Sequence, residues 1–332
     1  MAEANLQILL KSRPEGRPGP EHFELVQSPI PEPRHGEVLV RHRFLSLDPY
    51  MRGRMSDAVS YAPPVPLGGV MEGECVGEVV QSQHPNFAPG DWVSGARGWQ
   101  GWSAAHGSTL VKLPAGSGVS PSAYLGVLGM PGRTAWIGVT EVLRPKPGET
   151  FVVAAASGAV GAVAGQVARR MGARVVGIAG GAEKCRYVTE ELGFDACLDH
   201  REGLEAALDA ACPNGIDCYF ENVGGSVQKS VFPRMREFGR IAFCGMVAEY
   251  NQSPPPPGPN LMALVRKRLT LQGFLVNDHP RAGQEWMRNG AVLLREGKLQ
   301  FREDVAQGLE NAPAAFVGLL EGRNFGKLVV AI

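Results

Sequence analysis

The chain lacks an excess of charge, a long apolar run and paired cysteines, and each absence removes a class of function. Its 332 residues carry 33 Lys and Arg against 33 Asp and Glu, so no general attraction to nucleic acid or an anionic membrane is expected. No run approaches 18 consecutive apolar residues, the length a membrane-spanning helix needs. The six cysteines have no C-x-x-C spacing and are expected to be reduced core residues. We therefore expect a cytoplasmic protein without nucleic-acid or membrane partners.

A strand, turn, helix and second strand are predicted in succession between residues 151 and 181. The apolar run Phe151–Ala155 precedes Ala156-Ser157-Gly158-Ala159-Val160-Gly161, which is the G-x-G-x-x-G fingerprint with alanine in its first position. Apolar residues at helical spacing predict a helix over Gly158–Met171, and Arg174–Ala179 is predicted as the second strand.

The small residues of this turn suit a dinucleotide. Gly158 lets the backbone approach a pyrophosphate, Gly161 lets helix and strand pack closely, and the helix N-terminus offers amides to the phosphate charge. A glycine-rich turn with no ligand is the alternative.

The end of the second strand indicates which nicotinamide coenzyme binds. An acidic side chain there would bind the ribose hydroxyls of NAD, but the chain has Gly180 and Gly181, and Lys184 follows in the next helix. An ammonium at that point would neutralise the ribose phosphate of NADP. We therefore predict NADPH, with a solvated surface lysine as the alternative for Lys184. Glu183 argues mildly against this, although a glutamate at a helix start is ordinary.

The pattern of elements changes near residue 129. Before it, short β-runs separated by Gly and Pro predict a mostly antiparallel domain, and after it strands alternate with helices as in a doubly wound parallel sheet. We expect a first domain over 1–128, completed by 300–332, and a second over 129–299. The final strand, Gly326–Val330, is expected to rejoin the first domain. Residues 253–259, with five prolines, are expected to form a stiff exposed loop. The strands expected are Leu6–Leu10, Phe23–Val26, Glu37–Leu47, Glu74–Val80 and Asp91–Val93 in the first domain, and Phe151–Ala155, Arg174–Ile178, Ala196–Leu198, Cys218–Glu221, Arg240–Cys244 and Thr270–Phe274 in the second, with a later helix at Gln284–Glu296.

Several local motifs resemble the zinc-free double-bond reductases of the medium-chain dehydrogenase/reductase superfamily. These motifs are residues 46–55, 129–132, 221–225 and 324–327. Tyr61, together with residues 180–186 and 308–313, makes the chain most similar to bacterial NADPH-dependent curcumin reductases, which are related to prostaglandin reductases and plant 2-alkenal reductases. The resemblance implies an α/β protein with a GroES-like β-rich domain, a Rossmann domain and a homodimeric assembly.

The resemblance also implies a cofactor site built from residues that follow the strands. His200 would lie beside the adenosine, where prostaglandin reductases have tyrosine, and Asn222 has a turn residue as its alternative role. The implied cofactor residues are Ser157, Gly158, Ala159, Val160, Gly161, Lys184, His200, Asn222, Cys244, Gly245, Met246, Tyr250, Phe274, Leu275, Val276 and Asn324.

No zinc site is expected, although alcohol dehydrogenases of the same superfamily use one. The stretch 68–74 has no histidine where the zinc enzymes carry a Gly-His-Glu motif, and the seven histidines show no paired metal spacing. Glu72 and Glu74 are expected to be structural or surface carboxylates. Without a Lewis acid, conjugate reduction suits the predicted site better than alcohol oxidation.

The resemblance implies transfer of hydride from NADPH to the β-carbon of an enone or alkenal, which leaves negative charge on the carbonyl oxygen. Tyrosine suits the stabilisation of that charge, because its phenol donates a hydrogen bond while neutral. The candidate catalytic residues are Tyr50, Tyr61 and Tyr250, each with an aromatic wall as its alternative role, and Arg52 and Arg54 either contact substrate or pair with backbone and carboxylates. A quinone reductase of the same fold and a non-catalytic NADPH-binding sensor or structural protein remain the alternative functions.

Overall fold

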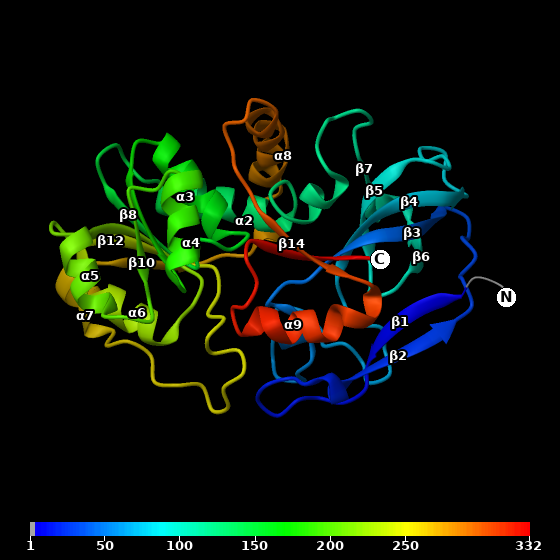
Figure 1. The fold of residues 1–332 in the computed structure, drawn as a ribbon, viewed down its shortest axis with the longest axis horizontal. Helices are drawn as coiled ribbons and strands as arrows, with labels where there is room; N and C mark the ends of the chain where they lie inside the picture. The colour runs from blue at the N-terminus through cyan, green and yellow to red at the C-terminus, as the bar shows by residue number, and fades with distance from the viewer. Residues whose placement is uncertain (1–3) are drawn as a thin grey trace. The chain divides into compact units, whose positions relative to one another are not determined.

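The computed structural model describes residues 4–332, which divide into two compact units (Figure 1). One unit contains the chain up to Leu125 together with Glu303–Asn324 and Leu328–Ile332. The other contains Gly126–Arg302 and Phe325–Lys327. No helix within residues 4–332 has the length and apolarity needed to cross a membrane.

The first unit is built on antiparallel β-structure. Its seven-stranded sheet has the order β14-β15-β3-β4-β5-β7, and β6 pairs with β3. Because β15 pairs with β3, the last strand of the chain joins this sheet as predicted. The elements are β1 (Asn5–Leu10), β2 (Phe23–Ser28), β3 (Glu37–Ser46), α1 (Met51–Arg54), β4 (Glu74–Ser82), β5 (Trp92–Arg97), β6 (Trp102–His106), β7 (Val111–Lys112), β14 (Glu303–Gln307), α9 (Ala312–Leu320) and β15 (Lys327–Ala331).

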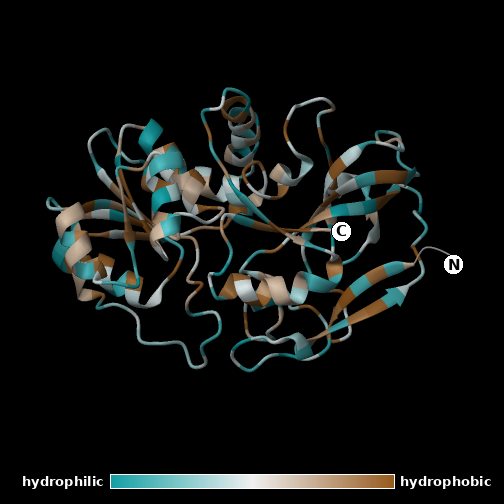
Figure 2. Ribbon diagram, in the orientation of Figure 1, coloured by the Kyte–Doolittle hydropathy of each residue, from teal (hydrophilic) through white to brown (hydrophobic). Residues whose placement is uncertain are grey.

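Aromatic packing fixes the core of the first unit. The rings of Phe23 and Trp99 stack with centroids 5.6 Å apart, and Phe316 of α9 meets Trp99 edge to face at 5.6 Å. In the antiparallel ribbon of β1 and β2, Ile8, Leu10 and Phe23 belong to this core, while Leu25 is half exposed; Figure 2 shows apolar and polar residues mixed along both strands.

The second unit contains the predicted six-stranded parallel sheet, in the order β10-β9-β8-β11-β12-β13. Its central strands are apolar and buried on both faces, as helices on either side require (Figure 2). The elements are α2 (Met130–Ile137), β8 (Thr150–Ala154), α3 (Gly161–Arg170), β9 (Arg174–Ala179), α4 (Ala182–Arg186), β10 (Ala196–Asp199), α5 (Leu204–Ala211), β11 (Ile216–Glu221), α6 (Gly225–Val231), β12 (Met235–Phe243), α7 (Met262–Lys267), β13 (Thr270–Gly273) and α8 (Pro280–Arg295).

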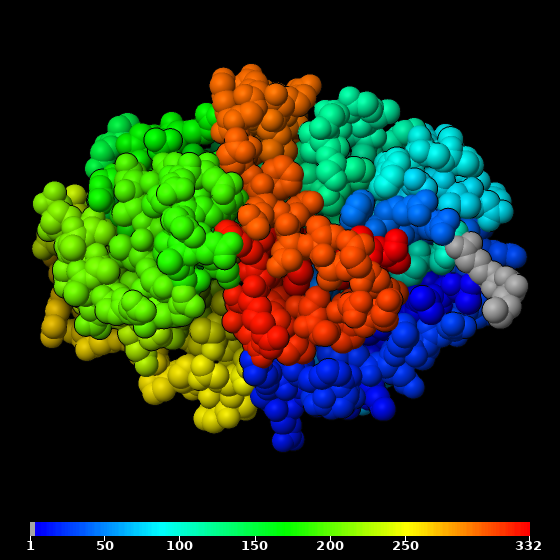
Figure 3. All heavy atoms as spheres, in the orientation of Figure 1, coloured from blue at the N-terminus to red at the C-terminus, as the bar shows by residue number. Residues whose placement is uncertain are grey.

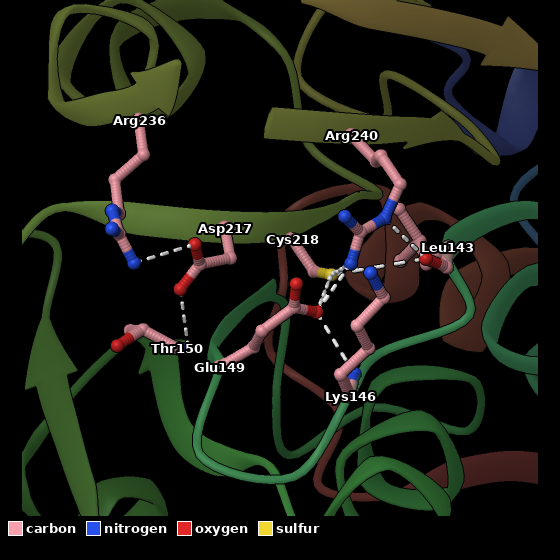
Figure 4. A network of polar contacts seen from close by, with 8 residues as sticks. All are labelled: Leu143, Lys146, Glu149, Thr150, Asp217, Cys218, Arg236 and Arg240. Carbon is pink, nitrogen blue, oxygen red and sulfur yellow. Dashed lines mark hydrogen bonds and ion pairs between the residues drawn. The ribbon is translucent and has the colours of Figure 1, made fainter. Parts of the chain in front are cut away.

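Side chains tie together the amino ends of these strands (Figure 4). Arg240 of β12 donates through Nε to the Leu143 carbonyl at 2.6 Å and through Nη2 to the Glu149 carboxylate. Asp217 of β11 accepts a hydrogen bond of 2.8 Å from the backbone N–H of Thr150, the first residue of β8. Asp217 therefore joins β11 to the start of β8, and Arg240, level with Cys218 of β11, joins β12 to the segment that precedes β8.

The proline-rich loop that follows β12 lies at the molecular surface, where it is drawn in yellow in Figure 3. Most residues of 252–261 are exposed, as predicted. The loop leaves the carboxyl end of β12, which is the end at which the candidate site is built.

Candidate functional site

The turn after β8 has the small residues and the shape of a dinucleotide-binding turn, but its limits differ from the prediction. The strand ends at Ala154 because Ala155 adopts a left-handed conformation with φ +52°. The N–H of Ala156 then donates to the Ile178 carbonyl at 2.9 Å, which ties the turn to β9. The helix predicted from Gly158 begins instead at Gly161, because residues 158–160 complete the turn.

Two glycines of this turn differ in how much room surrounds them. A β-carbon at Gly161 would lie 2.3 Å from the Ala155 carbonyl oxygen, so no other residue fits there without moving the backbone. At Gly158 the same contact would be 3.2 Å, which a shift of a few tenths of an ångström relieves. Gly161 is therefore required for packing, while Gly158 keeps open the space that a phosphate would occupy.

A cavity of the second unit opens onto this turn. It is a small pocket, with a volume of about 10 Å³, partly open to solvent and beside the first residues of α3. The ten-residue helix α3 presents its positive N-terminal end there, which favours an anion. The lining residues are Val127, Ser157, Gly158, Ala159, Ala162, Val163, Tyr187, Phe301, Arg302, Gly326 and Lys327.

Tyr187 is a site residue that the sequence interpretation missed. Its ring packs edge to face on Phe325 with centroids 5.1 Å apart, and burial raises the pKa of its phenol to about 12. Its buried hydroxyl has no hydrogen-bond partner within residues 4–332. Its partner Phe325 lies far along the chain, in the short segment Phe325–Lys327 that belongs to the second unit, and no local motif signals that contact.

The predicted coenzyme-selecting residues gather at the end of β9. No acid follows Ala179, and β10 runs beside β9 so that Asp199 pairs with Ala179. His200 therefore reaches back across the turn, and a β-carbon at Gly180 would lie 2.9 Å from its Nε2. Lys184 lies in α4, which starts directly after Gly181.

The remaining predicted cofactor residues of the second unit also follow strand ends. Asn222 donates through Nδ2 to the Ala154 carbonyl at 2.8 Å, so it joins the carboxyl ends of β11 and β8. The loop from Cys244 to Tyr250 is held by this turn, because the Val247 N–H donates to the Asn222 carbonyl at 3.2 Å. A β-carbon at Gly245 would lie 2.7 Å from the Tyr250 hydroxyl.

Cys244 and Phe274 also lie at the carboxyl ends of the parallel strands. Burial, reinforced by the Glu221 carboxylate, raises the pKa of the Cys244 thiol to about 12, so the thiol is neutral. Phe274, which precedes Leu275 and Val276, packs edge to face on Phe220 at 6.2 Å.

Two of the three candidate catalytic tyrosines lie together in the first unit. The guanidinium of Arg54 is 5.7 Å from the ring of Tyr50 and 4.5 Å from that of Tyr61, and it pairs with Glu72 at 3.5 Å. Burial, with the carboxylates of Asp48 and Glu72, raises the pKa of Tyr50 far above its ordinary value.

The other residues near these tyrosines have structural partners. Arg52 donates to the carbonyls of Gly16 and Pro14 at 2.7 and 3.2 Å, so both arginines pair with backbone or carboxylate groups. Asn324, the remaining predicted cofactor residue, ends the segment Glu303–Asn324 of the first unit.

Comparisons with known proteins agree with this architecture. One family model, the N-terminal domain of oxidoreductase, matches residues 6–113, and a second, zinc-binding dehydrogenase, matches 159–290. NADPH-dependent curcumin reductase of Escherichia coli (strain K12) is 50% identical over 337 residues, covering 99% of this chain and 97% of the relative. 2-Alkenal reductase (NADP(+)-dependent) of Nicotiana tabacum is 42% identical over 346 residues, covering 100% and 99%. CurA from Vibrio vulnificus in complex with NADPH has a TM-score of 0.94 and 48% identity, with 98% of both chains covered.

The antiparallel unit, the doubly wound parallel sheet and its glycine turn define a medium-chain dehydrogenase/reductase. Within that class, the chain belongs to the family of the NADPH-dependent curcumin reductases, 2-alkenal reductases and prostaglandin reductases. The resemblance inferred from the local motifs and the predicted fold class are both confirmed.

The second family model is named for zinc, but the residues of this chain do not fit a zinc site. Cys75, directly after the stretch 68–74, is fully buried and donates its thiol to the Gly98 carbonyl at 3.3 Å. Within residues 4–332, no three His, Cys, Asp or Glu side chains come close enough together to hold a metal ion. The carboxylate of Glu72 forms ion pairs with Arg54 and Arg97. No step of the chemistry is therefore assigned to zinc.

Proposed function

We propose that the protein is an NADPH-dependent reductase of the carbon–carbon double bond in α,β-unsaturated ketones and aldehydes. Relatives named for curcumin and for 2-alkenals support this substrate class, and the Vibrio vulnificus relative binds NADPH. The observation that carries the proposal is the end of β9, where basic side chains stand beside a dinucleotide turn and the two residues directly after the strand are glycines rather than an acid. The basic side chains would bind the 2′-phosphate on the ribose of NADPH, whereas NAD has no phosphate for them to bind.

Bound NADPH supplies a hydride to the β-carbon of the substrate, and the protein must stabilise the enolate oxygen that results. The raised pKa keeps the phenol of Tyr50 protonated, so it can donate a hydrogen bond to that oxygen. Tyr61 is exposed enough to meet a substrate, and Arg54 holds its ring by a cation–π contact. Tyr250, over Gly245, is the candidate donor of the second unit.

The test of the reaction is NADPH oxidation across a panel of substrates. We expect NADPH oxidation with curcumin and with 2-alkenals, and mass spectrometry should detect the substrate with its carbon–carbon double bond saturated. Assays with quinones in place of enones distinguish an enone reductase from a quinone reductase. Assays with NADH in place of NADPH test the coenzyme preference. Turnover of quinones alone would overturn the proposed substrate class, and binding of NADPH with no turnover would favour a sensor.

Replacement of each tyrosine by phenylalanine identifies the donor. The variant that lacks the donor hydroxyl should have a kcat about 100-fold lower, but some activity should remain because the coenzyme still delivers hydride. Tyr124→Phe is a matched control, since Tyr124 is buried and lies outside the predicted site. Equal kcat for Tyr50→Phe, Tyr61→Phe, Tyr250→Phe and the control would assign proton supply to water.

We also propose that the enzyme is a cytoplasmic homodimer. Within residues 4–332 the edge strand β13 pairs on one side only, with β12, and the apolar residues Leu271 of that strand and Leu275 shortly after it are exposed. A second copy of the same edge would cover them. Light scattering should give twice the chain mass, and Leu271→Asp should give the monomer. The six free cysteines agree with a reducing compartment.

A further inference from the structure

Each glycine at the end of β9 is covered by a basic side chain from the end of β10. His200 covers Gly180, and Arg201 covers Gly181, where a β-carbon would lie 2.2 Å from Arg201 Nη2. Gly181 has φ +100°, so this turn needs glycine both for its backbone and for the guanidinium above it. Arg201 was not among the residues predicted from the sequence.

Arg201 is held in place by the carboxylate of Asp199. The Nε and Nη2 donors form a fork with Oδ1 and Oδ2 at 3.1 and 3.0 Å, and the backbone N–H of Arg201 donates to Oδ1 at 3.1 Å. Hydrogen bonds from Arg201 hold the pKa of Asp199 well below its ordinary value, so the pair consists of two charged groups. Within residues 4–332, Nη1 of Arg201 has no hydrogen-bond partner.

An unpaired carboxylate at this place would have the opposite selectivity. Asp199 ends β10 directly beside the end of β9, where it would repel a ribose phosphate and accept hydrogen bonds from ribose hydroxyls. Its pairing with Arg201 cancels that negative charge. A guanidinium edge then remains over the turn, and guanidinium groups bind phosphate through such edges.

We propose that Arg201 determines coenzyme specificity, because it neutralises Asp199 and presents its free Nη1 edge to the 2′-phosphate of NADPH. The inference rests on the coenzyme of the proposed function, but not on its substrate. It assigns to this chain a second cation at the end of β9 beside Lys184, and it makes Asp199 a residue that becomes unfavourable to NADPH when Arg201 is lost.

Coenzyme titrations of the full-length protein without substrate test this role. Arg201→Ala should weaken NADPH binding by about 10-fold and leave NADH binding within about 2-fold, since only NADPH carries the phosphate. Arg201→Lys should retain part of the preference. The double variant Arg201→Ala with Asp199→Asn should recover part of the NADPH affinity, because it removes the exposed carboxylate.

Arg186→Ala is the matched control, since Arg186 is an exposed arginine of the adjacent α4 and should leave both dissociation constants unchanged. Adenosine 2′,5′-bisphosphate and 5′-AMP, titrated calorimetrically, should repeat the difference without the nicotinamide. Equal weakening of NADPH and NADH by Arg201→Ala, or no change in their ratio, would overturn the inference. A protein that shows the predicted ratio but reduces no enone would instead contradict only the proposed reaction.

Discussion

At the amino ends of its strands the parallel sheet is held by ion pairs, whereas at the carboxyl ends it is covered by glycine turns and loops. Arg240, Glu149 and Asp217 join three strands at the first edge (Figure 4). At the other edge, the backbone of Gly161 and the side chain of Asn222 meet the strand ends directly. At the amino edge, the polar groups bond to one another. At the carboxyl edge, space and hydrogen-bond donors remain for a ligand, as is general in doubly wound sheets.

The same difference appears in two carboxylates. Burial alone would raise the pKa of Glu149 at the amino edge, but hydrogen bonds from the Lys146 N–H and from Arg240 outweigh it and lower the pKa. Glu221, which ends β11 at the carboxyl edge, is fully buried, and this burial raises its pKa although the Val223 and Gly224 N–H groups oppose the rise. Among residues 4–332, Glu149 pairs with a cation, Arg240, whereas Glu221 forms no ion pair.

The largest expected effect is that of Gly161→Ala at the carboxyl edge. The added β-carbon meets backbone atoms of Ala155, so the turn must open. We expect about 1–3 kcal/mol lower stability and NADPH binding weakened by about 100-fold. Gly158→Ala, which meets the same oxygen only at 3.2 Å, should weaken binding with little loss of stability. Thermal unfolding and NADPH titration of both variants check this, and a Gly161→Ala variant that binds normally would contradict it.

Arg240→Ala should have the reverse profile at the amino edge. It leaves the partly buried Glu149 carboxylate without its cation and removes the bond to Leu143, which should cost about 2–3 kcal/mol. NADPH affinity should not change, because the variant lies at the opposite ends of the strands. Denaturant unfolding and coenzyme titration measure the two quantities separately. Arg236→Ala, at a more exposed ion pair with Asp217, should cost less.

Sequence patterns predicted the fold because strands and helices of this length carry clear apolar periodicity. The succession of six strands along the chain, their parallel sheet and the return of β15 followed from that periodicity and from the resemblance. The strands β6, β7 and β14 were missed; β7 is only two residues long, and both β7 and β14 lack a continuous apolar face. The start of α3 was misplaced, because residues 158–160 have helix-compatible spacing but belong to the turn.

The candidate site was predicted in part. Its cofactor residues were named because they follow strands or match family motifs, and within the second unit the structure places them at the carboxyl edge. Arg201 and Tyr187 were missed because their positions depend on contacts made across the fold. The first needs the fork with Asp199, and the second needs the packing of Phe325.

The two carboxylates should give opposite pH dependences. Since the folded pKa of Glu221 is raised, its contribution to stability is complete below the unfolded pKa of about 4.3 and is lost as pH rises through the folded pKa. The folded pKa of Glu149 is lowered, so its contribution is present above about 4.3 and is lost as pH falls through the folded pKa.

Glu221→Gln and Glu149→Gln check these signs. In denaturant unfolding between pH 3 and 8, the stability of Glu221→Gln should rise relative to the wild type as pH rises, and the lower stability of Glu149→Gln should approach that of the wild type as pH falls. Parallel profiles for the two variants would show that the edges do not differ electrostatically.

The smallest expected effect is that of Ala155→Gly, which tests whether the carboxyl edge stores backbone strain. Ala155 has φ +52°, a left-handed conformation that costs an L-residue about 1 kcal/mol and that glycine adopts freely. Glycine also gains entropy in the unfolded chain, worth about 0.4–1 kcal/mol in the opposite direction, so the net change should lie within about 0.5 kcal/mol.

Arg144→Gly is the matched control, because Arg144 has φ +47° at an exposed helix end away from the turn. Its stability change should be equally small, and its NADPH affinity should be that of the wild type. Ala155→Gly should weaken NADPH binding by about 2- to 3-fold, because a freer residue before Ser157 leaves the turn less preorganised. If Ala155→Gly and Arg144→Gly bound NADPH equally well, the left-handed conformation of Ala155 would not contribute to coenzyme binding. Binding would then depend on the glycines and the cations at the carboxyl edge.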